Sequence, residues 1–390
     1  MAKGRGGFIG QDGLNAPDSP TGVTGTAGSS SVSVAFTAPT DVGGSAITGF
    51  RVQDGTNAHG ASGSSSPITV TGLTNGTAYT FNVWAINAFG YSAPSDASGS
   101  VTPAAPVVPA GRAVFGGGTG SNDETLDYVE ISSTGNATDF GDVVIGGAGQ
   151  DTAGGTASTT RGIWAGGYSS GARDIITYIT VASAGNAQDF GDLSSANYGV
   201  YGGNNSTRSV FGGGDGSLSN KLEYVTIAST GNSATFGNLV TSHGRGAGCC
   251  SPTKGFQIAG SSRANIDIWT TATLGNATDF GDLLGNAEPQ AASNETRGIV
   301  GASNSSVDIS YITMASAGNA VDFGDLITST RPTGGAAANS TRWVVGGGGS
   351  NQNVIQYVTI ASTGNATDFG DLTVGRYYMG GLSNSNGGLY

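Results

Sequence analysis

The sequence predicts an all-β protein, and three observations support this. Glycine supplies 70 of the 390 residues, while Asp, Glu, Lys and Arg together make up only 11%, against about 25% in an ordinary soluble domain. No window carries apolar residues at i, i+3, i+4 and i+7, the spacing of an amphipathic helix. A nine-residue phrase also occurs six times, first as TGNATDFGD at 134–142. A phrase that returns every 43 to 50 residues is typical of a solenoid or a propeller.

The repeated phrase marks six units. Its phenylalanine recurs every 43 to 50 residues, at Phe140, Phe190, Phe236, Phe280, Phe323 and Phe369. A motif present six times cannot be one catalytic centre, so we expect these residues to be structural. We find no catalytic, cofactor-binding or metal-binding set in the sequence, and we predict that the protein is not an enzyme and takes no cofactor.

Charge and hydropathy exclude several classes of function. The formal net charge is −12 with only 15 Lys and Arg, whereas a nucleic-acid binder needs a basic surface to meet phosphate. No run of 18 or more apolar residues is present, so we expect no membrane insertion. The N-terminus has two early cations but no apolar stretch, so we expect no secretory signal and synthesis in a cytoplasm.

The two cysteines, Cys249 and Cys250, are adjacent and cannot build a disulfide framework. We expect them to be small buried residues of a strand, with a vicinal disulfide or adventitious metal binding as the alternative. The only histidines, His59 and His243, have no recognisable partners for a catalytic triad.

Residues 17–104 differ in character from the rest of the chain. Apolar residues alternate at Val32, Val34 and Phe36, and the strongest alternation runs over 79–86. Period two in several short runs, separated by Gly, Pro and Asn, predicts an antiparallel β-sandwich. A polar, Gly-rich arm at 1–16 precedes it, and a Pro/Ala-rich linker at 105–111 follows.

This module resembles a fibronectin type III domain. The resemblance rests on Pro20, on DVGGSAITGFRV at 41–52 and on LTNGTAYTFNVWAINAFGYSAPS at 73–95. It implies that Tyr79 is the tyrosine corner, whose hydroxyl bonds to nearby backbone. Phe36 and Phe50 stand where the family places its core Trp and a second aromatic residue.

Each repeat in 112–390 shows three clear strands and one of small residues. A basic residue begins an apolar run that ends in glycine, as in RAVFGGG at 112–118, and a Tyr-bearing strand follows, as in LDYVEISS at 126–133. The phrase with its lone phenylalanine comes next. This order resembles a kelch blade with Phe in place of Trp, and implies a six-bladed β-propeller over 112–390. The strand in GRYYMGGLSNS at 375–385 would complete the first blade and close the ring.

Charged residues also recur with the repeats. The DFGD aspartates are Asp139, Asp189, Asp279, Asp322 and Asp368. They lack the neighbouring motifs of a kinase metal site, so we expect Asx turns, with calcium binding as the alternative. For the repeated arginines we expect ion pairs with the aspartates of a neighbouring blade. The alternative is a ring of cations, with Lys254, that holds an anionic sugar or a carboxylate. These arginines are Arg112, Arg161, Arg208, Arg297 and Arg342.

The combination of a fibronectin-type module and kelch-like blades is similar to virion structural proteins of tailed bacteriophages, especially those of marine cyanobacteria. The leader GRGGFIGQDG at 4–13 also resembles the starts of such proteins. The resemblance implies a non-enzymatic tail-fibre, neck or capsid-surface appendage, located in the virion and present in many copies. The arm at 1–16 would dock on other virion proteins, and the propeller would contact protein or host surface polysaccharide.

The alternative is a polysaccharide-acting enzyme, a glycoside hydrolase or lyase on a propeller scaffold. It would gather acids and aromatic residues in the loops of one repeat, and the fourth repeat diverges most, at Ile268, Trp269 and Glu288. Tyrosines expected in loops would either stack on sugar rings or pack between blades; they are Tyr168, Tyr201, Tyr377 and Tyr378. A bacterial surface adhesin is a third candidate, disfavoured by the expected lack of a secretion signal.

Overall fold

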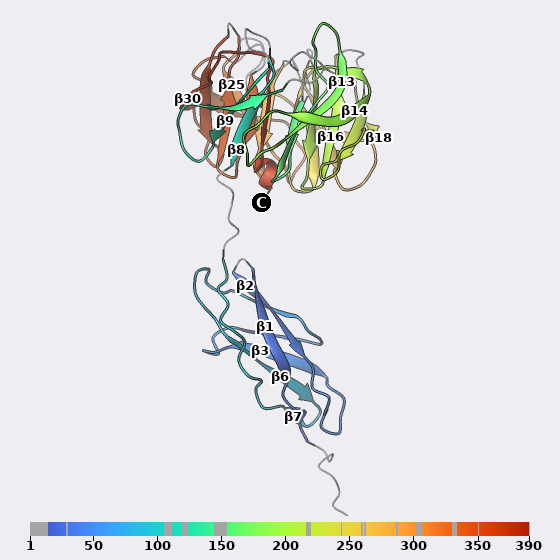
Figure 1. Ribbon diagram of the computed structural model, residues 1–390, viewed down its shortest axis with the longest axis vertical. Helices are drawn as coiled ribbons and strands as arrows, with labels where there is room; N and C mark the ends of the chain where they lie inside the picture. Colours follow the sequence, from blue (N-terminus) through green and yellow to red (C-terminus); the bar gives the residue numbers. More distant parts are fainter. Residues whose placement is uncertain are drawn as a thin grey trace, which may run out of the picture. The chain divides into compact units, whose positions relative to one another are not determined.

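The computed structural model consists of two compact units, Met1–Val107 and Val108–Tyr390 (Figure 1). Described are residues 15–28, 30–104, 111–118, 124–143, 154–215, 220–242, 244–258, 260, 263–285, 288–301, 306–329, 334–349 and 351–389. Of the expected arm at 1–16 and linker at 105–111, all but residues 15, 16 and 111 lie outside these ranges, as does His243.

The first unit is a pair of antiparallel sheets. One has the strand order β1-β2-β5, with β1 (Thr21–Gly28), β2 (Ser31–Thr37) and β5 (Ile68–Thr71). The other has the order β4-β3-β6-β7, with β3 (Gly49–Asp54), β4 (Gly60–Gly63), β6 (Phe81–Asn87) and β7 (Gly90–Tyr91).

The core of the first unit follows from the alternation in the sequence. Buried and less buried residues alternate along β2 and β6, so one face of each strand enters a single apolar cluster. Phe36 and Phe50 both lie in it, with ring centroids 4.8 Å apart. The Tyr79 hydroxyl accepts a hydrogen bond of 3.1 Å from the backbone N–H of Thr74, as expected for a tyrosine corner.

One buried carboxylate anchors a turn of this unit. Asp54 accepts hydrogen bonds from the Thr56 hydroxyl (3.0 Å) and the Ala58 backbone N–H (2.9 Å), and its Oδ2 lies 2.9 Å from Nδ1 of His59. Desolvation acts to raise the pKa of Asp54, but these hydrogen bonds outweigh it, and the pKa lies below its ordinary value.

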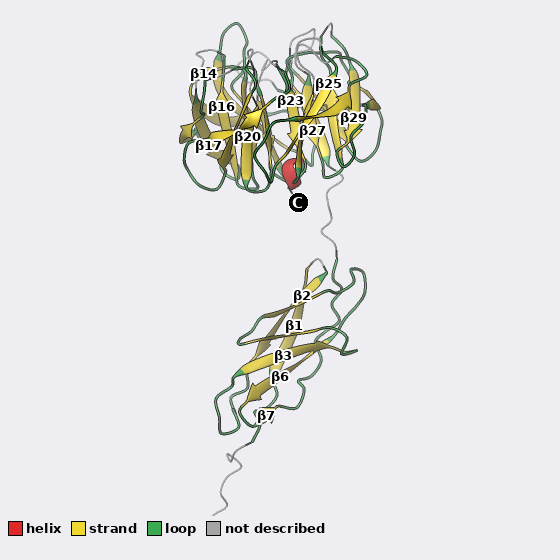
Figure 2. Ribbon diagram, turned by 180° about the vertical axis from the view of Figure 1, so that it is seen from behind, coloured by secondary structure: helices red, strands yellow, loops and turns green. Residues whose placement is uncertain are grey.

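The second unit contains six open, four-stranded antiparallel sheets (Figure 2), one for each repeat. We number them sheet 1 to sheet 6. Sheet 1 contains β8 (Arg112–Gly116), β9 (Thr125–Glu130), β10 (Thr138–Asp142) and β31 (Gly380–Ser383). Sheet 2 contains β11 (Gly154–Ala157), β12 (Arg161–Ala165), β13 (Arg173–Thr180) and β14 (Gln188–Asn197). Sheet 3 contains β15 (Val200–Asn204), β16 (Arg208–Gly213), β17 (Lys221–Thr226) and β18 (Ala234–Asn238).

The other three sheets have the same order. Sheet 4 contains β19 (Ala247–Cys250), β20 (Lys254–Ile258), β21 (Asn265–Thr270) and β22 (Thr278–Asp282). Sheet 5 contains β23 (Gln290–Ser293), β24 (Arg297–Gly301), β25 (Asp308–Thr313) and β26 (Val321–Asp325). Sheet 6 contains β27 (Gly335–Ala338), β28 (Arg342–Gly346), β29 (Val354–Thr359) and β30 (Thr367–Asp371). One 3₁₀ turn, η1 (Asn386–Gly388), follows β31.

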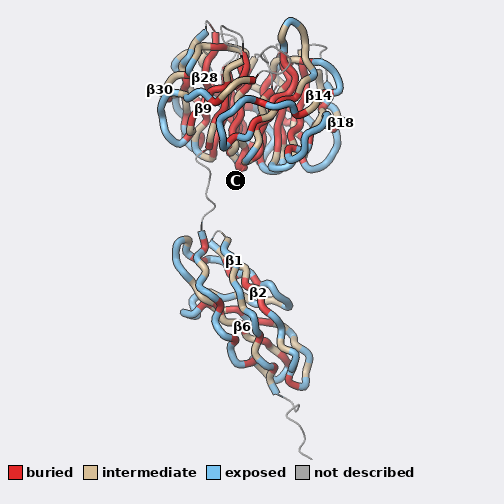
Figure 3. The backbone as a smooth tube through the Cα atoms, in the orientation of Figure 1, coloured by how far each residue is buried: buried red, intermediate tan, exposed pale blue. Residues whose placement is uncertain are grey.

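The small-residue strands of the six sheets are neighbours in a cycle. In order, β31, β11, β15, β19, β23 and β27 each contact the next, and β27 contacts β31 again. β31 reaches sheet 1 from the far end of the chain and pairs antiparallel with β8. Buried residues gather in the interior of this unit, and its outer turns are exposed (Figure 3). Within the described residues, no helix has the length and apolar character needed to cross a membrane.

Candidate functional site

The repeated phrase holds adjacent sheets together. Between sheets 1 and 2, the backbone N–H groups of Gly185 and Ala187 donate to the carbonyl oxygens of Phe140 (2.6 Å) and Asp142 (2.8 Å). The Asp142 N–H in turn donates to Oδ1 of Asn186 at 3.1 Å. The first half of one phrase therefore bonds to the outer edge of the preceding sheet, an edge that would otherwise be unpaired.

The same three hydrogen bonds occur at all six boundaries between sheets. At the last boundary, Gly135 of sheet 1 donates to Phe369 of sheet 6 at 2.8 Å, and Asp371 donates to Asn136 at 3.1 Å. The series of contacts therefore ends at the first repeat. In each repeat, the Gly-Asn pair of the phrase makes two of these hydrogen bonds to the preceding sheet.

Each phenylalanine of the phrase is the extra residue of a β-bulge. In sheet 1 the register passes from Asp139 opposite Asp127 to Gly141 opposite Leu126, which leaves Phe140 unpaired, and the other five sheets repeat this shift. The phenylalanines are buried. The glycine that follows is required, because a Cβ on Gly141 would lie 2.6 Å from the carbonyl carbon of Gly185.

The repeated arginines lie on tyrosine rings. In sheet 1 the guanidinium carbon of Arg112 is 4.4 Å from the centroid of Tyr128, which meets Phe140 edge-on at 5.8 Å. Arg161, Arg208, Arg297 and Arg342 repeat the arrangement in sheets 2, 3, 5 and 6. Each guanidinium also donates to a backbone carbonyl oxygen of the next sheet. The pairs are Arg112 to Val181, Arg161 to Ile227, Arg208 to Thr271, Arg297 to Ile360 and Arg342 to Ile131.

The expected ion pairs between these arginines and the DFGD aspartates do not occur among the described residues. The structure pairs Arg112 with Glu130 of its own sheet, at 2.7 Å. The aspartates Asp139, Asp189, Asp279, Asp322 and Asp368 remain exposed. The physical reason is that a guanidinium held flat on a tyrosine and bonded to buried carbonyls gains more than one paired with a solvated carboxylate.

Two of the expected alternatives bear on the same residues. Asp139 accepts a hydrogen bond from the N–H of Gly141 at 3.2 Å, which is the expected Asx-type contact. Within the described ranges, no group of three or more His, Cys, Asp or Glu is placed to hold a metal ion. Calcium binding therefore has no donor cluster in this part of the chain.

Sheet 4 departs from the arginine–tyrosine pattern. Lys254 and Ile268 replace the two residues together, and Lys254 Nζ bonds to Thr270 of its own sheet at 2.8 Å. Phe256 fills the space against Phe280, with ring centroids 5.2 Å apart. The divergence of this repeat is thus an alternative packing of the same interface.

The six small-residue strands meet around a small cavity. A cavity of about 30 Å³ is lined by residues of all six strands, among them Gly155, Gly202 and Gly381. A Cβ on Gly248 would overlap the carbonyl group of Gly202, so the crowding demands small residues. Cys249 and Cys250 are buried in β19 as free thiols, and burial raises the pKa of Cys250 to about 11.

One position breaks the equivalence of the repeats. In the Tyr-bearing strand, the residue before the tyrosine position is Asp127, Thr177, Glu223, Asp267, Ser310 or Gln356 in sheets 1 to 6. Several of these side chains bond to the segment that arrives from the preceding sheet. Asp267 accepts from the N–H of Val240 at 2.8 Å, and Gln356 from the N–H of Ile327 at 2.6 Å.

In sheet 1 this position forms a buried ion pair. Arg376, from the loop that leaves sheet 6, lies 2.6 Å from Oδ2 of Asp127, and both side chains are fully buried. The hydroxyl of Thr373 donates to Oδ1 of Asp127 at 2.5 Å. Desolvation raises the pKa of Asp127, although Thr373 and Arg376 favour its ionised form, and desolvation lowers the pKa of Arg376.

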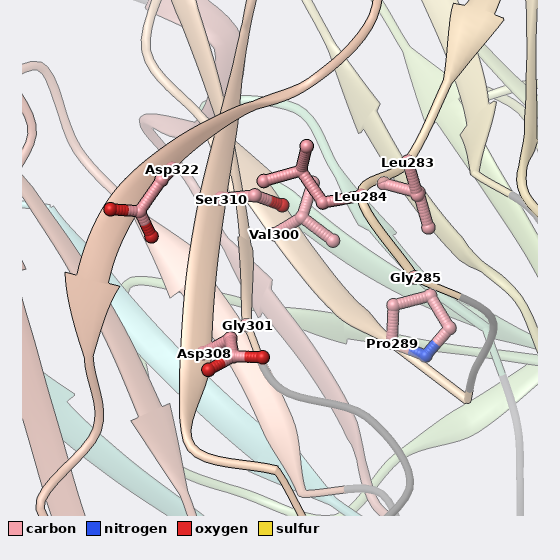
Figure 4. A pocket seen from close by; sticks show the side chains of 9 residues that line it. All are labelled: Leu283, Leu284, Gly285, Pro289, Val300, Gly301, Asp308, Ser310 and Asp322. Atoms are coloured by element: carbon pink, nitrogen blue, oxygen red, sulfur yellow. The ribbon is translucent and has the colours of Figure 1, made fainter.

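In sheet 5 the same position opens into a cleft (Figure 4). Its volume is about 300 Å³, against about 20 Å³ for a pocket at the equivalent place in sheet 3. The apolar wall is formed by Leu283, Leu284, Pro289 and Val300. The polar wall is formed by Asp308, Ser310 and Asp322. Of these residues only Asp322 was singled out from sequence. The sequence offers one indication of the cleft: Ser310 is the smallest of the six residues at this position of the repeats.

The tyrosines considered for sugar stacking contact other protein groups. Tyr168 meets Tyr198 edge-on at 5.2 Å, and Tyr377 lies 5.3 Å from Tyr378. Tyr201 lines the small cavity among the small-residue strands. Glu288 of the divergent repeat pairs with Arg245 at 3.1 Å, and Arg245 also pairs with Asp215 at 2.8 Å. These tyrosines and Glu288 thus have partners within the protein, and Tyr168 also remains 43% exposed. None of them lines the cleft in sheet 5.

Comparisons with known proteins concern the first unit. The model of the fibronectin type III domain matches residues 18–100. A crystal structure of domains A168-A170 from titin is similar at 34% identity over 23% of this chain and 32% of that chain, with a TM-score of 0.22. The chain thus spans about a third of the titin segment it matches. No curated protein matches the chain. Residues 18–100 therefore form a fibronectin type III domain within an all-β protein.

Proposed function

We propose that residues 112–390 form a six-bladed, kelch-like β-propeller closed by β31. Six four-stranded sheets with small-residue strands in a cycle support this. The hydrogen bonds of the repeated phrase between sheet 6 and sheet 1 support it further, because a solenoid would leave its terminal repeats unjoined.

We further propose that the protein is a non-enzymatic virion structural protein. It would be a tail-fibre, neck or capsid-surface appendage that makes protein or host-glycan contacts. The observation that carries the proposal is the use of the repeated residues: the phrase and the arginine–tyrosine pairs serve to join sheets. The product is a rigid platform with loops free to vary. Many copies on one particle would convert weak contacts into strong attachment.

Immunogold electron microscopy of purified virus particles tests the location. With an antiserum against residues 112–390, label at the tail tip or fibres supports host adhesion, and label over the capsid or neck supports a decorating role. Unlabelled particles that contain no band for the protein on a blot refute the virion location. Particles carrying a deletion of residues 1–16 test docking, because loss of the protein from those particles is expected.

A polysaccharide-acting enzyme is the second candidate, and the cleft in sheet 5 favours it. Asp308 and Asp322 both line this cleft, and paired carboxylates are the usual machinery of glycoside hydrolysis. Release of reducing ends from host capsular polysaccharide, lost in Asp308→Asn and Asp322→Asn but kept in Asp279→Asn, would support this function. Turnover that is absent, or equal in all variants, would refute it.

A further inference from the structure

The chain itself shows what the cleft in sheet 5 is built to hold. In sheet 1, the guanidinium of Arg376 occupies the equivalent place: it pairs with Asp127 and donates to the backbone carbonyls of Thr125 and Gly117. This side chain comes from the loop between β30 and β31. The site is thus an arginine receptor that its own chain fills.

The strand register makes the two places equivalent. In sheet 1, Asp127 lies opposite Asp139, and Thr125 lies opposite Asp142. In sheet 5, Ser310 lies opposite Asp322, and Asp308 lies opposite Asp325. Ser310 therefore stands where Asp127 stands, and Asp308 where Thr125 stands. Sheet 5 thus lacks a carboxylate at the position of Asp127 but has one, Asp308, at the position of Thr125.

Charge and shape of the cleft both suit a guanidinium. Asp308 and Asp322 bring two carboxylates, and within the described residues neither forms an ion pair. Leu284 and Pro289 on the opposite wall, and Val300 beside Ser310, offer apolar surface for the methylene stem of an arginine (Figure 4). A volume of about 300 Å³ is at the low end of small-ligand sites, which suits one side chain better than a run of sugar rings.

We propose that this cleft binds an arginine side chain of a partner protein. The inference rests on the proposed function and specifies its contact with another protein. The guanidinium lies between Asp308 and Asp322 in charge-assisted hydrogen bonds. It takes the place in sheet 5 that Arg376 takes in sheet 1, with carboxylates from other positions of the sheet.

A methyl NMR titration of the full chain tests the proposal. The probe is the blocked tripeptide acetyl-Gly-Arg-Gly-amide, and the reporters are the methyl groups of Leu283, Leu284 and Val300. Saturable shifts confined to these methyls are expected. The citrulline tripeptide, which has the same shape without the charge, should shift them far less.

Two variants and a control complete the test. Asp322→Asn should weaken arginine binding by about tenfold or more, the effect of losing one charge-assisted hydrogen bond. Ser310→Gln should abolish it by filling the cleft as Gln356 fills its counterpart. Asp279→Asn, the matched change in sheet 4, should leave it unaltered.

The proposal is overturned if citrulline binds as well as arginine, if neutral sugars shift these methyls and arginine does not, or if Asp322→Asn and Asp279→Asn behave alike with the fold intact. Absence of the protein from virus particles would refute the virion location without altering this titration, so the two proposals fail separately.

Discussion

A single methyl group at the boundary of sheets 3 and 4 should separate the two sheets. A Cβ on Gly237 would overlap the backbone carbonyl of Gly275 in the next repeat. Neither backbone can yield without breaking the contacts of the phrase, so Gly237→Ala should push the sheets apart. The facing glycine is the matched control: a Cβ on Gly275 meets nothing within 4 Å, and its φ is not positive.

The magnitude follows from the hydrogen bonds at this boundary. Gly275 donates to Phe236 (3.1 Å), Ala277 to Asn238 (2.8 Å), and Asn238 to the Asn276 side chain (3.0 Å). At about 0.5–1.5 kcal/mol each, less about 0.4–1 kcal/mol from a stiffer unfolded chain, Gly237→Ala should lower the free energy of unfolding by about 1–4 kcal/mol. Gly275→Ala should leave it unchanged or raise it by about 0.4–1 kcal/mol.

Urea unfolding followed by tryptophan fluorescence measures both variants. Trp269 is a suitable reporter because it is buried in the cluster with Phe236 and Ala277 at this boundary. A Trp84→Phe background removes the signal of the first unit. Equal stability of Gly237→Ala and the parent, or equal loss in both variants, would show that the close approach of the two glycines is not what joins the sheets.

Three further results are expected. Arg297→Lys should lower the stability of the second unit by about 1 kcal/mol in thermal melts, since lysine keeps the charge but loses the flat contact with Tyr311; an unchanged melting temperature contradicts this. The lowered pKa of Asp54 means that its contribution is present above its ordinary pKa of 3.8 and is lost as pH falls below it. The first unit should therefore weaken in acid, and Asp54→Asn should cost about 2 kcal/mol at neutral pH and flatten that acid dependence. Cys249 and Cys250 should resist a thiol reagent at pH 8 in the native protein and react fully in guanidinium chloride, because burial raises the pKa of both thiols; fast labelling of the native protein would contradict their burial.

The sequence was most informative where local patterns decide structure. Alternation in 79–86 predicts a β-sandwich, and the motifs at 41–52 and 73–95 give the resemblance to a fibronectin type III domain, which the family match confirms. The Tyr79 hydrogen bond agrees with the tyrosine corner that this resemblance implies. The phrase predicts six equivalent units, because a motif that recurs every 43 to 50 residues is expected to make the same contact in each repeat. The need for the second glycine of the phrase could not be predicted, because it arises from close contact with backbone about 40 residues away in the sequence.

The arginine contacts and the cleft could not be deduced from spacing. A sequence shows that Arg112 and Asp139 recur together, but not that Arg112 lies opposite Glu130, three residues along β9 from the partner of Asp139. That offset is about 10 Å in an extended strand, which favours the nearer tyrosine ring. The cleft depends on how a loop from one sheet meets Ser310 of the next, and this is set only when both sheets are assembled.

The position of β31 has a consequence for biosynthesis. This strand follows all the other described strands of the second unit in the sequence, yet it pairs with β8, the earliest of them, and separates β27 from β11. A nascent chain therefore cannot complete sheet 1 until residue 383 has emerged. Chains that stop early keep a bare strand edge beside apolar surface, the kind of feature that chaperones and proteases recognise. Because β31 completes sheet 1, the native stability of this unit depends on synthesis through residue 383.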